Sequence, residues 1–318
     1  MDFLIDLQSV SLSYGSVQAL RDVTLQLPQG RIGLLGPNGA GKSSLLKILM
    51  GLLPPSAGRG RVLGQELAGN TNGGDNYALR RLIGFMPEAD ALVPGLRGIE
   101  YVSLAGELYG MPRKQAQRRA HEVLTYLELE DARYRRLDEY STGMKQRIKL
   151  AQALIHDPPV LLLDEPTSGL DPAGRDTMLR LLLELGNEFG KSLILSTHLL
   201  ADVETVCERV VILLNGEVRG EGTVADLCAR RQDRYRLQVQ GDSTRFREGL
   251  LLEGVHVLQD NTHGEWRVTV PAGFATRTFF ALAENHAVVL RGIQPDDETL
   301  EELFLRTVSD QQQPDGKK

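Results

Sequence analysis

The chain has 318 residues, of which 42% are hydrophobic and 25% are charged, as in ordinary soluble globular proteins. This length favours about two domains. The formal net charge of -6 argues against a dedicated nucleic-acid-binding protein, which would carry a basic excess, so no nucleic-acid partner is expected. The two cysteines, Cys207 and Cys228, are too few for a disulfide framework, and we expect free thiols in a reducing compartment.

The N-terminal segment alternates apolar and polar residues over 3–10 (FLIDLQSV) and again over 23–27 (VTLQL). This pattern predicts two half-buried strands, with Tyr14 in a loop between them. The first ten residues lack the basic start and long apolar core of a signal peptide, so none is expected. No stretch reaches the roughly 18 apolar residues that would span a bilayer. If the protein works at a membrane, we expect another chain to supply the spanning part.

Residues 36–43 read GPNGAGKS and fit the phosphate-binding pattern G-x-x-x-x-G-K-[ST]. The apolar run 31–35 before this segment predicts a buried strand, and residues 44–50 after it predict a helix. Glycines let backbone N–H groups approach a phosphate, and the positive end of the helix dipole faces the same point. We therefore expect a nucleoside triphosphate site, with Lys42 on the β- and γ-phosphates and the Ser43 hydroxyl on Mg²⁺. The residues expected to contact the nucleotide here are Gly36, Pro37, Asn38, Gly39, Ala40, Gly41, Lys42, Ser43 and Ser44.

Four more apolar runs predict strands that are buried in a sheet, and helical patterns lie between them. The strands are expected at 82–86, 160–163, 192–196 and 209–214. Helices are expected at 98–129, with a break near 110–112, and at 175–189. Another helix is expected to begin directly after Ser141, which would be its N-cap. Strands that alternate with helices indicate an α/β fold whose sheet is covered on both faces.

A charged stretch at 229–234 (ARRQDR) marks a change of composition, which we interpret as a domain boundary. The first domain is therefore expected to cover 1–230 and a small α+β domain 231–309. Within the second domain, strands are expected at 235–240, 255–259 and 266–270, and helices at 244–252, 274–285 and 297–308. The polar tail 310–318 (DQQQPDGKK) is expected to be disordered.

Three motifs in this order resemble those of ATP-binding cassette (ABC) ATPases, the nucleotide-binding subunits of transporters. They are the phosphate loop, the segment YSTGM at 140–144 and the Asp164-Glu165 pair after an apolar strand. The resemblance covers residues 1–228. It implies a P-loop NTPase fold with a mixed core sheet, an antiparallel β subdomain and a helical subdomain, followed by the small α+β accessory domain. It also implies ATP hydrolysis with Mg²⁺.

The resemblance assigns roles to the polar residues at the ends of the predicted strands. Asp164 is expected to bind Mg²⁺ beside Ser43. Glu165 is expected to act as the general base or to orient the attacking water, which suits a carboxylate because in-line attack needs a positioned, polarised water. His198 is expected to hydrogen-bond the γ-phosphate. Tyr14 is expected to stack on adenine, although packing would explain a lone tyrosine equally well.

The segment at 140–144 stands where the family signature reads Leu-Ser-Gly-Gly-Gln, and it keeps Ser141 and Gly143 of that signature. Ser141 offers a hydroxyl, Gly143 allows the backbone to approach a ligand closely, and a helix N-terminus is expected at the same place. Together these groups are suited to binding a γ-phosphate. In the family this surface completes the ATP site of the opposite subunit, and Asp171 lies in the loop that contacts that subunit. The resemblance therefore implies a homodimer, or a heterodimer with a second ATPase subunit, around two Mg-ATP. Without the resemblance, Ser141 would be only a helix cap.

Glu88 departs from the family pattern, which has glutamine after this strand, in contact with Mg²⁺ and the attacking water. Glutamate keeps an oxygen acceptor, loses the amide donor and adds a negative charge near the phosphates. Similar Pro-Glu pairs occur in ATPases of drug- and polysaccharide-type exporters. We therefore keep Glu88 among the catalytic and metal-binding candidates.

Residues 88–112 and the ending ETLEELFL at 298–305 resemble the exporter group in which ATPase and membrane chains are separate, of the ABC-2 type. This implies a polytopic membrane partner, a location at the cytoplasmic face of the cell membrane, and export as the process driven. Two alternatives stay open: a soluble ABC ATPase acting on ribosomes or nucleic acid, and a non-hydrolysing ATP switch. A P-loop GTPase is disfavoured because no Asn-Lys-x-Asp motif is present.

Overall fold

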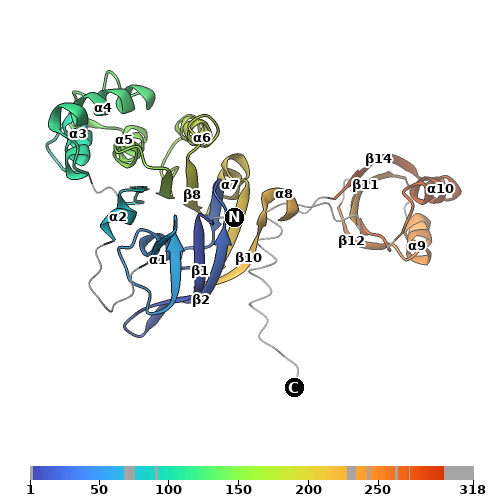
Figure 1. Cartoon of the computed structure of the whole chain (residues 1–318). Helices are drawn as coiled ribbons and strands as arrows, with labels where there is room; N and C mark the ends of the chain where they lie inside the picture. The colour runs from blue at the N-terminus through green and yellow to red at the C-terminus, as the bar shows by residue number, and fades with distance from the viewer. Residues whose placement is uncertain are drawn as a thin grey trace. The chain divides into compact units, whose positions relative to one another are not determined.

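A computed structural model describes residues 3–67, 76–89, 92–227, 234–241, 244–261, 264–271 and 273–296. The chain divides into two compact units, the first ending at Val224 and the second starting at Ala225 (Figure 1). The boundary expected at 230 falls outside the described residues, as do Cys228, the helix expected at 297–308 and the tail 310–318.

The chain begins with an antiparallel sheet in the order β2-β1-β4-β5. Its strands are β1 (Ile5–Tyr14), β2 (Val17–Leu27), β4 (Ala57–Val62) and β5 (Gln65–Glu66). Alternation along β1 turns Ile5 and Leu7 into the core, as the sequence predicts.

The prediction that Tyr14 lies in a loop is wrong. Tyr14 ends β1 and pairs with Val17 across a tight turn in which Gly15 has φ 59°. The pairing register of β1 and β2 shifts between Val10↔Val23 and Leu12↔Leu20, at a bulge where Asp22 has φ 45°. The bulge breaks the alternation, which explains why the first half of β2 is hidden in the sequence.

A mixed sheet in the order β10-β9-β3-β8-β7-β6 forms the centre of the first unit in the described residues. Its strands are β3 (Arg31–Leu35), β6 (Ile83–Met86), β7 (Val160–Asp164), β8 (Ser192–Thr197), β9 (Arg209–Leu214) and β10 (Glu217–Thr223). All but the β9–β10 pair are parallel. Every residue of β7 is buried, as expected for a central strand with both faces covered. The five predicted strands are confirmed, and β10 is an addition.

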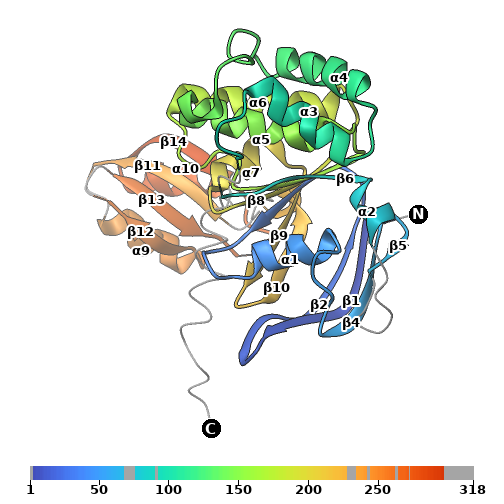
Figure 2. The same ribbon diagram turned by 90° about the vertical axis from the view of Figure 1, so that its left-hand side faces the viewer.

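Helix α1 (Lys42–Leu49) lies between the two sheets (Figure 2). Its residues Leu45, Leu46 and Ile48 are buried in one cluster with apolar side chains of both sheets. This burial fixes the N-terminus of α1 at the carboxyl end of β3.

The opposite face of the mixed sheet carries a layer of helices (Figure 2). These are α5 (Thr142–Leu154), α6 (Pro172–Asn187) and α7 (Leu200–Val206), and α3 (Gly98–Leu108) and α4 (Arg113–Tyr126) pack against α5. The predicted break near 110–112 is present, with Gly110 at φ 89° after α3. Short helical turns occur at α2 (Tyr77–Arg80), η1 (Leu137–Glu139) and α8 (Val224–Leu227). The α/β fold with β and helical subdomains is therefore confirmed.

The second unit has the element order βαββαβ and the sheet order β12-β13-β11-β14, a ferredoxin-like arrangement. Its elements are β11 (Arg234–Gln240), α9 (Thr244–Leu252), β12 (His256–Asp260), β13 (Glu265–Thr269), α10 (Arg277–Asn285) and β14 (Val289–Pro295). Phe246 of α9 and Phe279 of α10 join Leu237, Trp266 and Val268 in one core, so both helices cover the same sheet face. The α+β character matches the prediction, and β14 is the strand that the sequence pattern does not reveal.

Candidate nucleotide site

The loop between β3 and α1 is a tight cradle in which two glycines leave no room for a side chain. A Cβ on Gly36 would lie 2.3 Å from the Leu213 carbonyl oxygen, and a Cβ on Gly41 would lie 2.6 Å from the Ala19 oxygen. Gly41 also has φ 104°, in the region that favours glycine, and stands at the N-cap of α1. The first N–H groups of a helix have no partner within the helix, so this cradle is suited to an anion.

Lys42 lies at the floor of the cradle with only 6% of its surface exposed. Its Nζ donates to the carbonyl oxygens of Gly36 at 2.7 Å and Pro37 at 3.3 Å. Burial lowers the pKa of Lys42, and the negative charges of Glu165 and Asp164 counteract part of that effect. A lysine held in this way can exchange its carbonyl partners for phosphate oxygens, with which it forms stronger, charge-assisted hydrogen bonds.

Two carboxylates lie at the end of β7, which neighbours β8: Asp164 is the last residue of the strand and Glu165 follows it, and both are 5% exposed. Asp164 Oδ1 accepts a hydrogen bond from Ser196 Oγ at 2.8 Å. The Glu165 N–H donates to the Ser196 carbonyl oxygen at 2.8 Å, and Glu165 has φ 49°, an unusual value for a residue with a Cβ. The end of β8 therefore fixes both the side chain of Asp164 and the backbone of Glu165.

The carboxylate of Glu165 is held through both of its oxygens. Thr197 Oγ1 donates to Oε2 at 3.3 Å, and His198 Nδ1 lies 2.9 Å from Oε1. The His198 side chain is about half exposed. An Nδ1–H of His198 orients the carboxylate, which leaves the Nε2 side of the ring for another contact.

Glu88 follows β6 and brings a third carboxylate to the same place. Its side chain is exposed and lines the cleft, and its charge is one of those that oppose the lowered pKa of Lys42. The carbonyl oxygens of Pro87 and Glu88 both accept hydrogen bonds from Lys149 Nζ, at 3.0 and 2.9 Å. The backbone of this segment is thus fixed from α5.

These groups surround a cleft of about 430 Å³. Its lining residues are Val17, Gln18, Ala19, Asn38, Gly39, Ala40, Gly41, Lys42, Ser43, Ser44, Glu88, Asp164 and Glu165. Tyr14 is 46% exposed, with its hydroxyl 3.5 Å from Ser44 Oγ, so it lies beside the lining residues rather than among them. His198 reaches the cleft through Glu165. The cleft therefore gathers most of the residues expected to contact nucleotide and metal.

Ser141, Gly143 and Asp171 do not line this cleft. Ser141 caps α5 by accepting from Met144 N–H at 3.3 Å, and Asp171 caps α6 by accepting from Gly174 N–H at 3.1 Å. Both caps are exposed. The first part of α5 is tied to the loop before α6, because Gln146 Nε2 donates to the Ser168 carbonyl oxygen at 2.9 Å. These residues form a second polar surface on the same chain.

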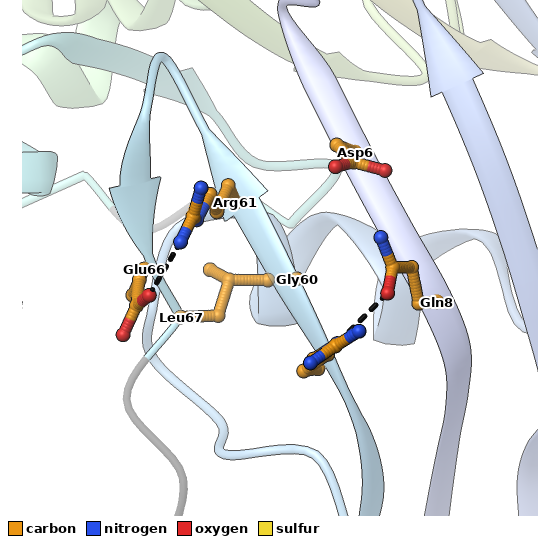
Figure 3. A pocket seen from close by; sticks show the side chains of 7 residues that line it. Asp6, Gln8, Gly60, Arg61, Glu66 and Leu67 are labelled. Atoms are coloured by element: carbon orange, nitrogen blue, oxygen red, sulfur yellow. Dashed lines mark hydrogen bonds and ion pairs between the residues drawn. The ribbon is translucent and has the colours of Figure 1, made fainter.

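A different cavity, of about 480 Å³, lies on the antiparallel sheet and contains none of the predicted site residues (Figure 3). Arg59 Nε donates to Gln8 Oε1 at 2.8 Å there, and Arg61 pairs with Glu66 at 2.8 Å. Both arginines are thus already engaged by the side chains of Gln8 and Glu66. The residues that line this cavity also form no glycine loop like that at 36–43, so the cavity is a poorer phosphate site than the cleft.

Sequence reasoning missed several residues that support the site. Ser196 and Thr197 hold the two carboxylates; their position just before His198 at a strand end is a signal that could have found them. Val17, Gln18 and Ala19 line the cleft because β2 begins earlier than predicted. Lys149 gave no signal, since a lysine in a helix is usually exposed.

Comparison with known proteins agrees with this geometry. A family model described as ABC transporter matches residues 20–168. The chain is 33% identical over 309 residues to the uncharacterized ABC transporter ATP-binding protein YxlF of Bacillus subtilis (strain 168). This match covers 96% of this chain and 99% of that protein. It is 36% identical over 223 residues to the Nod factor export ATP-binding protein I of Rhizobium sp. (strain N33), covering 69% of this chain and 70% of that protein.

A solved structure of the ATP-binding cassette MJ0796 also resembles the chain. That structure is a dimer in a post-hydrolysis state bound to ADP and Pi. It matches with a TM-score of 0.62 and 31% sequence identity, and the match covers 69% of this chain and 98% of that one. Since a relative of the same family is matched along nearly its whole length, the chain belongs to the ABC transporter family, as an ATP-binding subunit with ATPase activity.

Proposed function

We propose that the cleft binds ATP with its triphosphate on the loop 36–43 and hydrolyses it with Glu165 as the residue that orients and deprotonates the attacking water. The observation that carries the proposal is that Lys42, at the start of α1, and the adjacent Asp164 and Glu165, at the end of β7, line one cleft. Lys42 neutralises phosphate charge, and Glu165 is fixed by Thr197 and His198. Tyr14, beside Ser44, stacks on the base.

Mg²⁺ fits the donor set of this cleft. Ser43 and Asp164 both line it and supply hard oxygen ligands of the kind that Mg²⁺ prefers, with nucleotide phosphate and water completing its shell. Glu88 is a further oxygen donor near the phosphates. The ion would neutralise charge that develops on the phosphate oxygens.

ABC ATPase subunits dimerise and work with membrane components, and we infer which surface of this chain takes part. Ser141, Gly143 and Asp171 lie outside their own cleft at exposed helix starts. We assign them to the γ-phosphate site of a second subunit, where a helix N-terminus and a hydroxyl can meet the phosphate. ATP then closes two subunits around two nucleotides, and hydrolysis opens them.

We propose that this motion drives export through a separate polytopic membrane subunit. In the described part of the chain, no helix is long and apolar enough to cross a membrane. The similarity to a Nod factor export ATP-binding protein supports export. We propose that the chain works at the cytoplasmic face of the cell membrane, on the membrane subunit. We take residues 1–230 as the ATPase domain and 231–309 as an accessory domain that stabilises the dimer.

The experiment that tests this function is affinity purification of the tagged chain from detergent-solubilised membranes. A stoichiometric polytopic membrane protein is the expected companion, with ATP hydrolysis by the purified complex. Recovery of ribosomal or nucleic-acid factors instead would leave the ATPase assignment in place and overturn the export proposal.

A further inference from the structure

Lys149 is a lysine in the interior of the protein. It lies on α5 with 1% of its surface exposed and is one of the largest fully buried side chains. Its Nζ donates to the carbonyl oxygens of Pro87 and Glu88 at 3.0 and 2.9 Å. A charged group is retained in the interior only where interactions offset its desolvation, and these two hydrogen bonds contribute to that.

The same helix approaches β6 again near its C-terminal end. A Cβ on Gly84 would lie 2.2 Å from the Ala153 carbonyl oxygen, which shows how near the two backbones are. Beyond the end of α5, His156 Nε2 lies 3.2 Å from the Ile83 carbonyl oxygen. The hydrogen bonds of Lys149 therefore add to a close packing of α5, and of the residues just after it, against β6 and the segment that follows β6.

The two ends of this connection lie at functional surfaces. Glu88, two residues after the end of β6, lines the ATP cleft together with Lys42 and Glu165. Ser141, at the start of α5, is the exposed cap that we assign to the nucleotide of a second subunit. The ammonium group of Lys149 thus connects the helix that carries Ser141 to the backbone of Glu88.

We propose that Lys149 is a positioning residue for ATP hydrolysis. It fixes the Pro87–Glu88 backbone, so that the Glu88 carboxylate keeps its place in the cleft and follows the movement of the helix that carries Ser141. This inference rests on the proposed function of the cleft. It implies that Lys149 acts on turnover through Glu88, whereas nucleotide affinity depends on the loop 36–43.

A double-mutant cycle on the full chain tests the inference. Lys149→Met removes the donor group at similar volume, and Glu88→Ala removes the carboxylate from an exposed position. We expect Lys149→Met to lower kcat for ATP by about tenfold or more, as misplacement of a catalytic group does, with the Kd for a non-hydrolysable ATP analogue changed by less than about threefold. In the Glu88→Ala background, the same change should alter kcat by less than about twofold, because the two residues act as a unit.

Two further variants make the result specific. Lys149→Arg keeps a charged donor and should recover most of the turnover. Lys191→Met is the matched control: Lys191 Nζ also donates to a backbone carbonyl, that of Pro158 at 2.8 Å, but lies at the other end of the strands from the cleft. It should leave kcat unchanged.

The outcomes separate the inference from the function on which it rests. If the wild-type chain does not hydrolyse ATP, the proposed function fails. If the wild type is active and Lys149→Met matches it, or if the losses of Lys149→Met and Glu88→Ala simply multiply, the inference alone is overturned. Should Lys149→Met not fold, Lys149→Gln replaces it in the cycle; if neither variant folds, Lys149 serves stability only and the inference is also overturned.

Discussion

Replacing Glu165 by glutamine removes the charge that the proposed reaction needs and leaves the rest of the cleft intact. The amide oxygen of glutamine can accept from His198 Nδ1, now 2.9 Å from Oε1, and the amide NH₂ can donate to Thr197 Oγ1, now 3.3 Å from Oε2. Both supporting contacts can therefore persist. The substitution then mainly removes the ability of the Glu165 side chain to accept a proton from water. A positioned general base contributes about 10²- to 10⁴-fold in rate. This corresponds to about 2.7–5.5 kcal/mol of activation free energy.

We expect Glu165→Gln to lose about 10²- to 10⁴-fold in kcat while its Kd for ATP stays close to that of the wild type. The affinity is retained because Lys42 and the glycine loop hold the phosphates. Steady-state phosphate release at saturating Mg-ATP measures the first quantity, and titration with a fluorescent ATP analogue measures the second. Glu204→Gln, at an exposed position of α7, is the control and should keep full activity. A Glu165→Gln protein that retained more than about a tenth of the wild-type kcat would refute the assigned role.

Three other changes give independent tests. Gly41→Ala should abolish ATP binding, because its Cβ would lie 2.6 Å from the Ala19 oxygen at φ 104°; normal affinity in a titration would contradict the cradle geometry. Glu88→Gln should keep ATPase activity, since an oxygen acceptor remains; a drop beyond about a hundredfold in kcat would show that the charge is needed. Burial raises the pKa of the Cys207 thiol to about 12, so in a Cys228→Ser background the native protein should resist iodoacetamide at pH 8 and react only when unfolded; rapid native labelling would show that the thiol is accessible.

The phosphate loop and the strands around it could be predicted because their signals are local. A glycine pattern between a strand and a helix and a fully apolar run before Asp164 need no knowledge of distant residues. The same holds for the break after α3, where Gly110 has φ 89°. The cleft follows from these elements, since the carboxyl ends of neighbouring parallel strands meet at one edge of the sheet.

The elements that escaped prediction depend on contacts between distant parts of the chain. The start of β2 is hidden by the bulge at Asp22, and its role in the cleft appears only once β2 pairs with β1. β14 contains Gly292 and ends at Pro295, residues that disfavour strands, and it is held by pairing with β11. Lys149 resembles a surface lysine in sequence, and only the folded chain brings the carbonyl oxygens of Pro87 and Glu88 to it.

The measurement that tests the central claim most directly is the molar mass in solution of the Glu165→Gln protein with and without saturating Mg-ATP, by light scattering. The claim is that each ATP is held between the loop 36–43 of one subunit and the surface with Ser141, Gly143 and Asp171 of another. The account predicts a mass of about twice the 35.1 kDa of the chain with Mg-ATP, which returns to that of one chain when the nucleotide is removed. A protein that bound ATP and stayed monomeric would contradict the account.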